Sequence, residues 1–301
     1  MVLNKIKLKM SQWRQASIIF KTNEVPACDM RSDETFHNRI DIEIPVFDNP
    51  SDKNKKPDAI LRGVLCKSIM RNSPTIIFAM GQNQNVEEAR NYIPESLLHY
   101  FNLVLVNFRG YGIENGTTKQ KSRGSEGVPS AKALEADIVR VYDYVKKHHK
   151  MKNFYAAGIS LGSSLITYLS SQRKIEAQLL VTPFNTMAHQ AHDLIKSVHK
   201  MKDLTLEQVE GILDHNFNSN ANMAKNNTKT SIIRAGNDQV VKKHFTDDLV
   251  THIKNLSSDV TIEYAPHNFE SPNPYVMSAL RTAIGTVFRN FMIDCTERNR
   301  V

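Results

Sequence analysis

Residues 154–165 constrain this chain most, because an apolar run meets a helix-like run there across one very tight turn. The apolar run predicts a short buried strand, and a G-x-S-x-G pattern centred on Ser160 follows it. A serine on so tight a strand-to-helix turn has a crowded backbone, so the residues two positions away must lack bulk, as Gly158 and Gly162 do. We expect the Ser160 hydroxyl to stand above the end of the strand, beside the first amides of a helix. The plainer interpretation is a serine in a glycine-rich turn.

The residues before this motif predict a sheet that starts with a hairpin. Between residues 39 and 46 apolar and polar side chains alternate, which is typical of a strand with one buried face. A polar turn over 49–58 and a second strand over 59–69 follow. We therefore expect an antiparallel hairpin at one edge of the sheet.

From residue 75 onward the apolar runs are continuous rather than alternating. Such runs are typical of parallel strands buried on both faces, and they cover 75–80, 103–107, 154–157, 177–181 and 230–234. Helix-like stretches separate them, at 86–100, 130–145 and 161–169. The alternation of Val260, Ile262 and Tyr264 predicts a last strand, and a closing helix follows over 277–291. This order predicts an α/β fold with a mostly parallel, doubly wound sheet, in a single domain over 39–301.

Residues 186–216 interrupt this rhythm with two amphipathic helices. Met187, Ala191 and Leu194 share one face of the first, and Thr205 with Gln208 predicts a capping box at the start of the second. Two interpretations stay open. The pair forms a small helical lid over a site, or it covers the sheet as ordinary helices do.

The first 38 residues form an N-terminal extension, which also has more than one interpretation. Leu3, Ile6, Met10 and Trp13 fall on one helical face with lysines around it, as in a basic amphipathic helix on an anionic membrane surface. The same residues are compatible with a helix packed on the domain. They also fit an extended segment, because several of them alternate with lysines.

Charge and cysteine content narrow the partners and the compartment. The 301 residues carry a net charge of +8, which is compatible with an anionic membrane or protein surface and also with an ordinary soluble basic protein. The lysines are dispersed, so no nucleic-acid partner is expected. Three isolated cysteines suggest a reducing, cytoplasmic setting without a disulfide framework, a metal site or a cofactor. We find no run long enough to span a membrane and no signal-peptide pattern.

Two further residues are placed to activate Ser160. A serine hydroxyl needs a base to accept its proton and an acid to orient that base. Asp238 and His267 each follow a predicted strand, where α/β sites form, and the chain order Ser, Asp, His is the one that G-x-S-x-G proteins of this architecture use. The alternatives are an aspartate that forms a turn and a histidine that merely occupies one.

The same architecture needs two backbone donors for a developing oxyanion. One is expected from the Leu161 N–H at the start of the helix. The other is expected from the turn after Met80, where we assign it to Gln82, because a backbone group needs only a position and no particular side chain.

Taken together, these residues resemble the α/β-hydrolase superfamily, and finer motifs resemble its bacterial and Bem46-like serine hydrolases. The motifs are Asn107-Phe-Arg-Gly-Tyr-Gly112, Gly124-Ser-Glu-Gly-Val-Pro-Ser130, Thr182-Pro-Phe184, Phe217-Asn-Ser219, Ile232-Ile-Arg-Ala-Gly-Asn-Asp238 and His267-Asn268. The resemblance runs from about residue 39 to 292 and implies an α/β-hydrolase fold. It does not name a substrate, because the superfamily spans many activities.

Three features depart from the family pattern. The oxyanion turn has Met80 before its glycine where the family usually has histidine, and Pro266 precedes the histidine in place of a small residue. Residues 113–123 separate two motifs that normally run together, so this insertion is expected to border the pocket, and its basic residues favour an anionic substrate or surface.

Two functional hypotheses follow. The first is a serine hydrolase of the esterase, thioesterase or lipase kind, which cleaves a small-molecule or acylated substrate through an acyl-enzyme formed on Ser160. The second is a non-catalytic protein of the same fold that binds an anionic membrane or protein surface. Labelling of Ser160 by a fluorophosphonate distinguishes the two, because only an activated serine reacts.

Overall fold

The computed structural model describes residues 19, 38–48, 56–82, 84–86, 88–111, 124–196 and 203–298. Apart from Ile19 and Asn38, the N-terminal extension therefore lies outside the described residues, and so does the whole 113–123 insertion. Neither the membrane-surface helix nor the placement of the insertion beside the pocket is tested by the structure.

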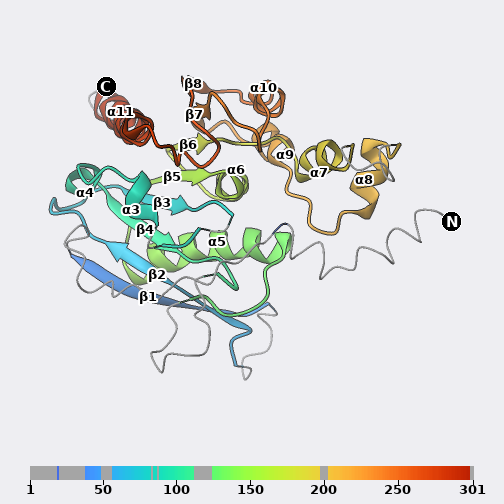
Figure 1. The fold of residues 1–301 in the computed structure, drawn as a ribbon. Helices are drawn as coiled ribbons and strands as arrows, with labels where there is room; N and C mark the ends of the chain where they lie inside the picture. Colours follow the sequence, from blue (N-terminus) through green and yellow to red (C-terminus); the bar gives the residue numbers. More distant parts are fainter. Residues whose placement is uncertain are drawn as a thin grey trace.

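An eight-stranded sheet in the order β1-β2-β4-β3-β5-β6-β7-β8 forms the centre of the molecule (Figure 1). The strands are β1 (Arg39–Val46), β2 (Ala59–Cys66), β3 (Thr75–Ala79), β4 (Asn102–Val106), β5 (Phe154–Ile159), β6 (Ala177–Val181), β7 (Lys229–Ala235) and β8 (Leu256–Ile262). β2 pairs antiparallel with both β1 and β4, and every other pairing is parallel. The predicted mostly parallel sheet with an N-terminal antiparallel hairpin is confirmed.

Helices cover both faces of this sheet, so the hydrophobic core has two parts, one on each face. The helices are α3 (Ala89–Tyr92), α4 (Leu97–Tyr100), α5 (Ala131–His148), α6 (Leu161–Gln172), α7 (Met187–Lys196), α8 (Leu206–Ile212), α9 (Ser219–Ala224), α10 (Lys243–Val250) and α11 (Pro274–Arg298). Apolar residues of α5, α6 and α10 pack on one face. Those of α3, α4 and α11 pack on the other. Burial on both faces explains why the parallel strands are continuously apolar.

The second strand ends at Cys66 and not at residue 69, and the structure differs more from the sequence-based prediction in two other elements. The helix expected over 86–100 is broken into α3 and α4 at Ile93, which is extended at φ −90°, ψ 121° because the following Pro94 disfavours a helical conformation there. The last strand begins earlier than expected and ends at Ile262, while Tyr264 lies beyond it, 82% exposed and at φ 60°. Val260 is 40% exposed, because β8 lies at the edge of the sheet.

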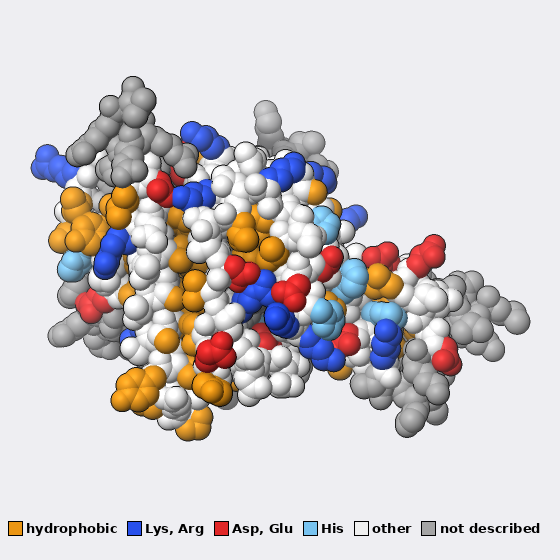
Figure 2. All heavy atoms as spheres, turned by 90° about the horizontal axis from the view of Figure 1, so that it is seen from above, with side chains coloured by type: hydrophobic (Ala, Val, Ile, Leu, Met, Phe, Trp, Pro, Cys, Tyr) orange, Lys and Arg blue, Asp and Glu red, His pale blue; other side chains and the backbone are white. Residues whose placement is uncertain are grey.

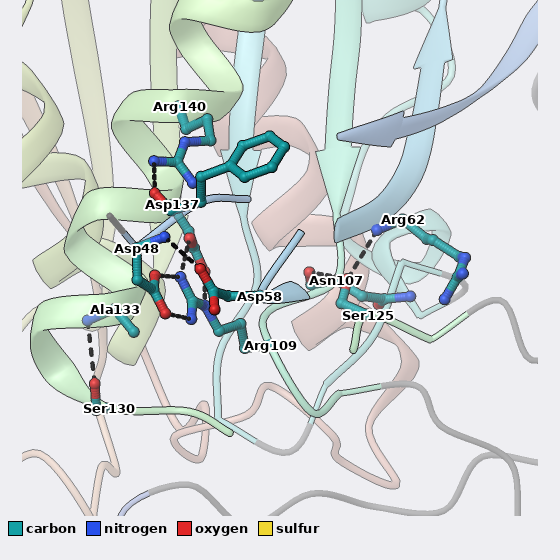
Figure 3. Close-up of polar contacts among 11 residues, drawn as sticks. Asp48, Asp58, Arg62, Asn107, Arg109, Ser125, Ser130, Ala133, Asp137 and Arg140 are labelled. Carbon is teal, nitrogen blue, oxygen red and sulfur yellow. Dashed lines mark hydrogen bonds and ion pairs between the residues drawn. The ribbon is translucent and has the colours of Figure 1, made fainter. Parts of the chain in front are cut away.

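Arg109 connects three separate parts of the fold (Figure 3). It follows β4, is 4% exposed, and donates to both carboxylate oxygens of Asp137 in α5, at 2.7 and 2.9 Å. It also donates to both oxygens of Asp48, just after β1, at 2.8 and 3.0 Å. One planar guanidinium thus joins the central sheet, the covering helix and the edge hairpin through two bidentate ion pairs.

A second polar contact brings two of the sequence motifs together. The Ser125 hydroxyl donates to the Asn107 carbonyl at 2.6 Å and accepts from the Arg62 amide of β2 at 2.9 Å (Figure 3). The motif that begins at Gly124 therefore lies against the end of β4, although the chain between them is long.

We predict that replacing Arg109 with Met destabilises the protein by about 3 to 5 kcal/mol, because it leaves a buried carboxylate unpaired. The measurement is urea unfolding. Asp48→Asn serves as the matched control, since Asp48 is more exposed than Asp137 and the inner ion pair survives, so its cost should be about 1 kcal/mol. Equal losses in the two variants would contradict this assignment.

A second prediction concerns Glu135 in α5. Burial raises the pKa of this carboxyl group from 4.5 to about 7, and the positive charge of Lys225 opposes the shift. The folded state thus keeps a proton that the unfolded chain releases, and stability falls as the pH rises from about 4.5 to about 7. Glu135→Gln should therefore raise the free energy of unfolding at pH 8 by roughly 1 kcal/mol and change it little at pH 4. Glu207→Gln, on the exposed side of α8, is the control and should show no such difference.

Candidate active site

Ser160 occupies the single residue between β5 and α6 and has a strained backbone, with φ 50° and ψ −113°. Its N–H donates to the Val181 carbonyl of the neighbouring strand at 2.9 Å, which holds the turn against the sheet. A Cβ on Gly158 would lie 2.4 Å from the Gly162 carbonyl carbon. A Cβ on Gly162 would lie 2.1 Å from the Ala79 carbonyl oxygen. Both glycines of the motif are therefore required by the close approach of backbone to backbone.

The structure brings the three predicted side chains together at the carboxyl ends of their strands. His267 Nε2 lies 2.9 Å from the Ser160 hydroxyl oxygen, and His267 Nδ1 lies 2.8 Å from Asp238 Oδ2. The histidine and aspartate side chains are 18% and 7% exposed, so both are largely shielded from water. The separations in sequence are 107 and 29 residues, which only the folded sheet can bridge.

The hydrogen bonds around Asp238 decide which proton His267 carries. Asp238 Oδ1 accepts from the Val240 and Val241 amides at 2.9 and 2.7 Å, so one oxygen fixes the turn and the other faces the imidazole. A carboxylate is an acceptor, so the neutral ring donates from Nδ1. Nε2 is then left to accept the hydroxyl proton of Ser160.

The two predicted oxyanion residues lie on neighbouring segments. Leu161 is the first residue of α6 and is buried, and Gln82 is half-buried in the turn that follows β3. Gly162 connects the two segments, because the carbonyls of Ala79 and Met80 lie directly against it. Within this turn the Gly81 N–H donates to the Gln84 side-chain oxygen at 2.8 Å. The Gly81 amide is therefore already engaged.

The two helices predicted over 186–216 are α7 and α8, which project to one side of the sheet (Figure 1). Thr205 and Gln208 form the predicted capping box. Two backbone hydrogen bonds join the start of the segment that carries α7 and α8 to its end. The Met187 N–H donates to the Phe217 carbonyl at 2.9 Å, and the Ser219 N–H donates to the Asn185 carbonyl at 2.8 Å. The pair is thus a closed insertion after β6. Whether it acts as a lid stays a prediction.

Asp248 of α10 clamps the base of this insertion. Its Oδ2 accepts from the side-chain amides of Asn185 and Asn220 at 2.7 and 2.8 Å, and these hydrogen bonds help to hold its pKa below the ordinary value against the effect of burial. The sequence analysis missed this clamp. The three polar residues lie on one loop and two different helices, α9 and α10, so no period along the chain connects them.

Several histidine side chains lie toward the end of the molecule that carries α7 and α8, among basic and acidic side chains (Figure 2). His189 and His192 belong to α7, and His244 belongs to α10. Across the part of the chain that the structure describes, no three His, Cys, Asp or Glu side chains are grouped to hold a metal ion. Of the described helices, none has the length and apolar character needed to cross a bilayer.

Comparison with known proteins identifies the fold. No family model matches the chain. The esterase Pf2001 of Pyrococcus furiosus aligns with a TM-score of 0.64 at 17% identity, over 90% of this chain and 98% of that one. Ferulic-acid-bound Est1E from Butyrivibrio proteoclasticus gives 0.56 at 17% identity, over 75% and 94%. The α/β hydrolase GrgF from a Penicillium species gives 0.60 at 12% identity, over 84% and 97%. The chain has the α/β-hydrolase fold.

We predict that Gly162→Ala destabilises the protein by about 3 kcal/mol or more, because the new methyl group would meet two backbone carbonyls that cannot move independently of β3. Thermal and urea unfolding measure the loss. Gly211→Ala is the matched control, since it also lies in a helix but a Cβ there meets nothing within 4 Å. That variant should be unchanged or stabilised by up to about 1 kcal/mol. Similar losses in both would argue against the close approach.

Proposed function

We propose that this protein is a serine hydrolase that cleaves a carboxylic ester or thioester through an acyl-enzyme. The observation that carries the proposal is the continuous hydrogen-bonded line from Ser160 through His267 to Asp238, with spacings of 2.9 and 2.8 Å. A strained turn at the start of a helix presents the hydroxyl, as this chemistry needs.

Each residue has a defined role in the proposed reaction. Ser160 attacks the substrate carbonyl while His267 Nε2 accepts the hydroxyl proton, and the histidine then returns this proton to the leaving group. Asp238 keeps the imidazole in the tautomer that can accept and stabilises the imidazolium that forms. Water repeats the sequence on the acyl-enzyme and releases the acid.

The Leu161 and Gln82 amides are the proposed donors to the oxyanion. Leu161 qualifies because it directly follows the nucleophile at the first turn of α6. Gln82 is proposed for its position, because it lies in the turn after β3, a segment that contacts the start of α6 at Gly162. Met80 occupies the position where the resembled family usually has histidine. This difference lies in a side chain, whereas the proposed donors are backbone N–H groups.

The substrate class follows from the site and the similar folds together. Est1E has been solved with ferulic acid bound, and Pf2001 is an esterase. We therefore propose a small carboxylic ester as the substrate of this protein. We also propose that α7 and α8 form a lid over the acyl group and that the finer motifs place the chain with the Bem46-like hydrolases. A peripheral association with anionic membranes would add acylated lipids to the substrates.

Labelling with a fluorophosphonate tests the mechanism. We expect the probe to modify the wild-type protein at Ser160 and to leave Ser160→Ala unmodified, because only the activated hydroxyl attacks phosphorus. Ser171→Ala is the matched control, a serine near the far end of the same helix, and should label as the wild type does. Asp238→Asn should lower kcat/KM for a p-nitrophenyl ester by about a thousandfold or more, because the imidazole then adopts the wrong tautomer.

A panel of p-nitrophenyl esters and thioesters of increasing chain length then defines the acyl group.

Well-folded wild-type protein that takes up no fluorophosphonate would exclude the proposed mechanism. It would favour the non-catalytic hypothesis instead.

A further inference from the structure

We infer that Gln84 and Tyr92 are positioning residues that lock the oxyanion turn to the loop carrying His267. This inference rests on the proposed hydrolase function and names residues that the triad pattern does not include. It is drawn from one chain of hydrogen bonds, which joins two loops that meet at the carboxyl edge of the sheet.

Three consecutive hydrogen bonds form this relay. The Gly81 N–H donates to Gln84 Oε1 at 2.8 Å, and Gln84 Nε2 donates to the Tyr92 hydroxyl at 2.5 Å. The Tyr92 hydroxyl in turn donates to the backbone carbonyl of Asn268 at 3.3 Å. Gly81 directly precedes the proposed donor Gln82, and Asn268 directly follows the base His267. The relay therefore spans the two halves of the proposed machinery.

The chemistry of the groups fixes the direction of the relay. A backbone N–H can only donate, so the amide oxygen of Gln84 must face Gly81 and its NH₂ must face Tyr92. The tyrosine oxygen then accepts from Gln84, which leaves its proton for the Asn268 carbonyl. Reversing any one member would set two donors or two acceptors against each other, so all three bonds can form together only in this direction.

Burial makes the relay costly to break. Tyr92 is 2% exposed and packs in the core under α11, so desolvation raises the pKa of its hydroxyl and keeps it protonated as a donor. Phe269, next to Asn268, is fully buried and holds the same loop at φ 58°. A hydroxyl or amide left without its partner in this setting costs about 1 to 3 kcal/mol.

The far end of the oxyanion turn is held by side chains as well. The Val86 N–H donates to Asn107 Oδ1 at 2.9 Å in a buried contact. The Asn85 N–H donates to the Glu88 carboxylate at 3.0 Å. The described residues between β3 and α3 belong to no strand, so these side-chain contacts help to position them.

The proposed catalytic consequence is geometric. An oxyanion donor contributes only if it lies within hydrogen-bond distance of the oxygen in the transition state, and a displacement of about 1 Å costs up to about a hundredfold in rate. His267 must reach the Ser160 hydroxyl at the same moment. By tying the two loops together, Gln84 and Tyr92 set the distance between donor and base without touching the substrate.

The test combines Tyr92→Phe, Gln84→Met and the double variant in steady-state hydrolysis of p-nitrophenyl butyrate. Because each single change breaks the same chain, we expect each to lower kcat by about tenfold with KM within about twofold. The double variant should lose no more than the worse single variant.

Tyr142→Phe is the matched control. Tyr142 is a buried tyrosine, 3% exposed, and its hydroxyl also donates to a backbone carbonyl, that of Lys174 at 3.4 Å, but it belongs to the core on the other face. It should lose as much thermal stability as Tyr92→Phe and keep its kcat. Equal kcat in the two variants, or losses that simply multiply in the double variant, would overturn the relay.

A second readout separates this inference from the proposed function. Hydrogen–deuterium exchange of peptides covering 78–84 and 263–270 is compared in Ser160→Ala with and without Tyr92→Phe. The relay predicts that both peptides exchange at least several-fold faster without the hydroxyl. Unchanged exchange overturns the relay, whereas a wild-type protein that neither labels nor turns over overturns the hydrolase function alone.

Discussion

The close contact between the start of α6 and the end of β3 is the constraint on which the rest of the site depends. Gly162 lies so near β3 that a Cβ would come within 2.1 Å of the Ala79 carbonyl oxygen. Only bare backbone permits this approach, which brings the first amides of α6 beside the turn after β3. The strain at Ser160, with φ 50°, has the same origin, because the chain must turn from strand into helix within one residue.

Different forces hold the sheet and the loops at its carboxyl edge. Apolar burial on both faces makes the sheet rigid, while the loops depend on polar side chains that bond to backbone or to each other, as Arg109, Asp238 and Gln84 do. Four of the eight non-glycine residues with positive φ in the described part of the chain lie at this edge, namely Ser160, Thr182, Tyr264 and Phe269. Each such residue costs on the order of 1 kcal/mol or more and persists only because the surrounding packing determines it.

Much of the fold could be predicted because its signals are local. Continuous apolar runs identify the buried strands, and the capping box at Thr205 is written in two residues. Errors arose where tertiary context overrides such patterns. Pro94 divides a stretch whose pattern predicts one helix. Tyr264 continues the alternating pattern of a strand, but β8, at the edge of the sheet, ends at Ile262. The polar network of Gln84 and Tyr92 was not foreseen, since hydrogen bonds between loops have no period along the chain.

By itself the sequence determined the α/β architecture, the need for glycine on both sides of Ser160, and the order of Ser160, Asp238 and His267 along the chain. These follow from periodicity and from steric limits that act within a few residues. Only the tertiary structure decided that Ser160, His267 and Asp238 lie 2.9 and 2.8 Å apart in turn, and that the turn after β3 is joined to the loop of His267 by hydrogen bonds. Such distances depend on how strands far apart in sequence pair and twist, and no local pattern specifies that.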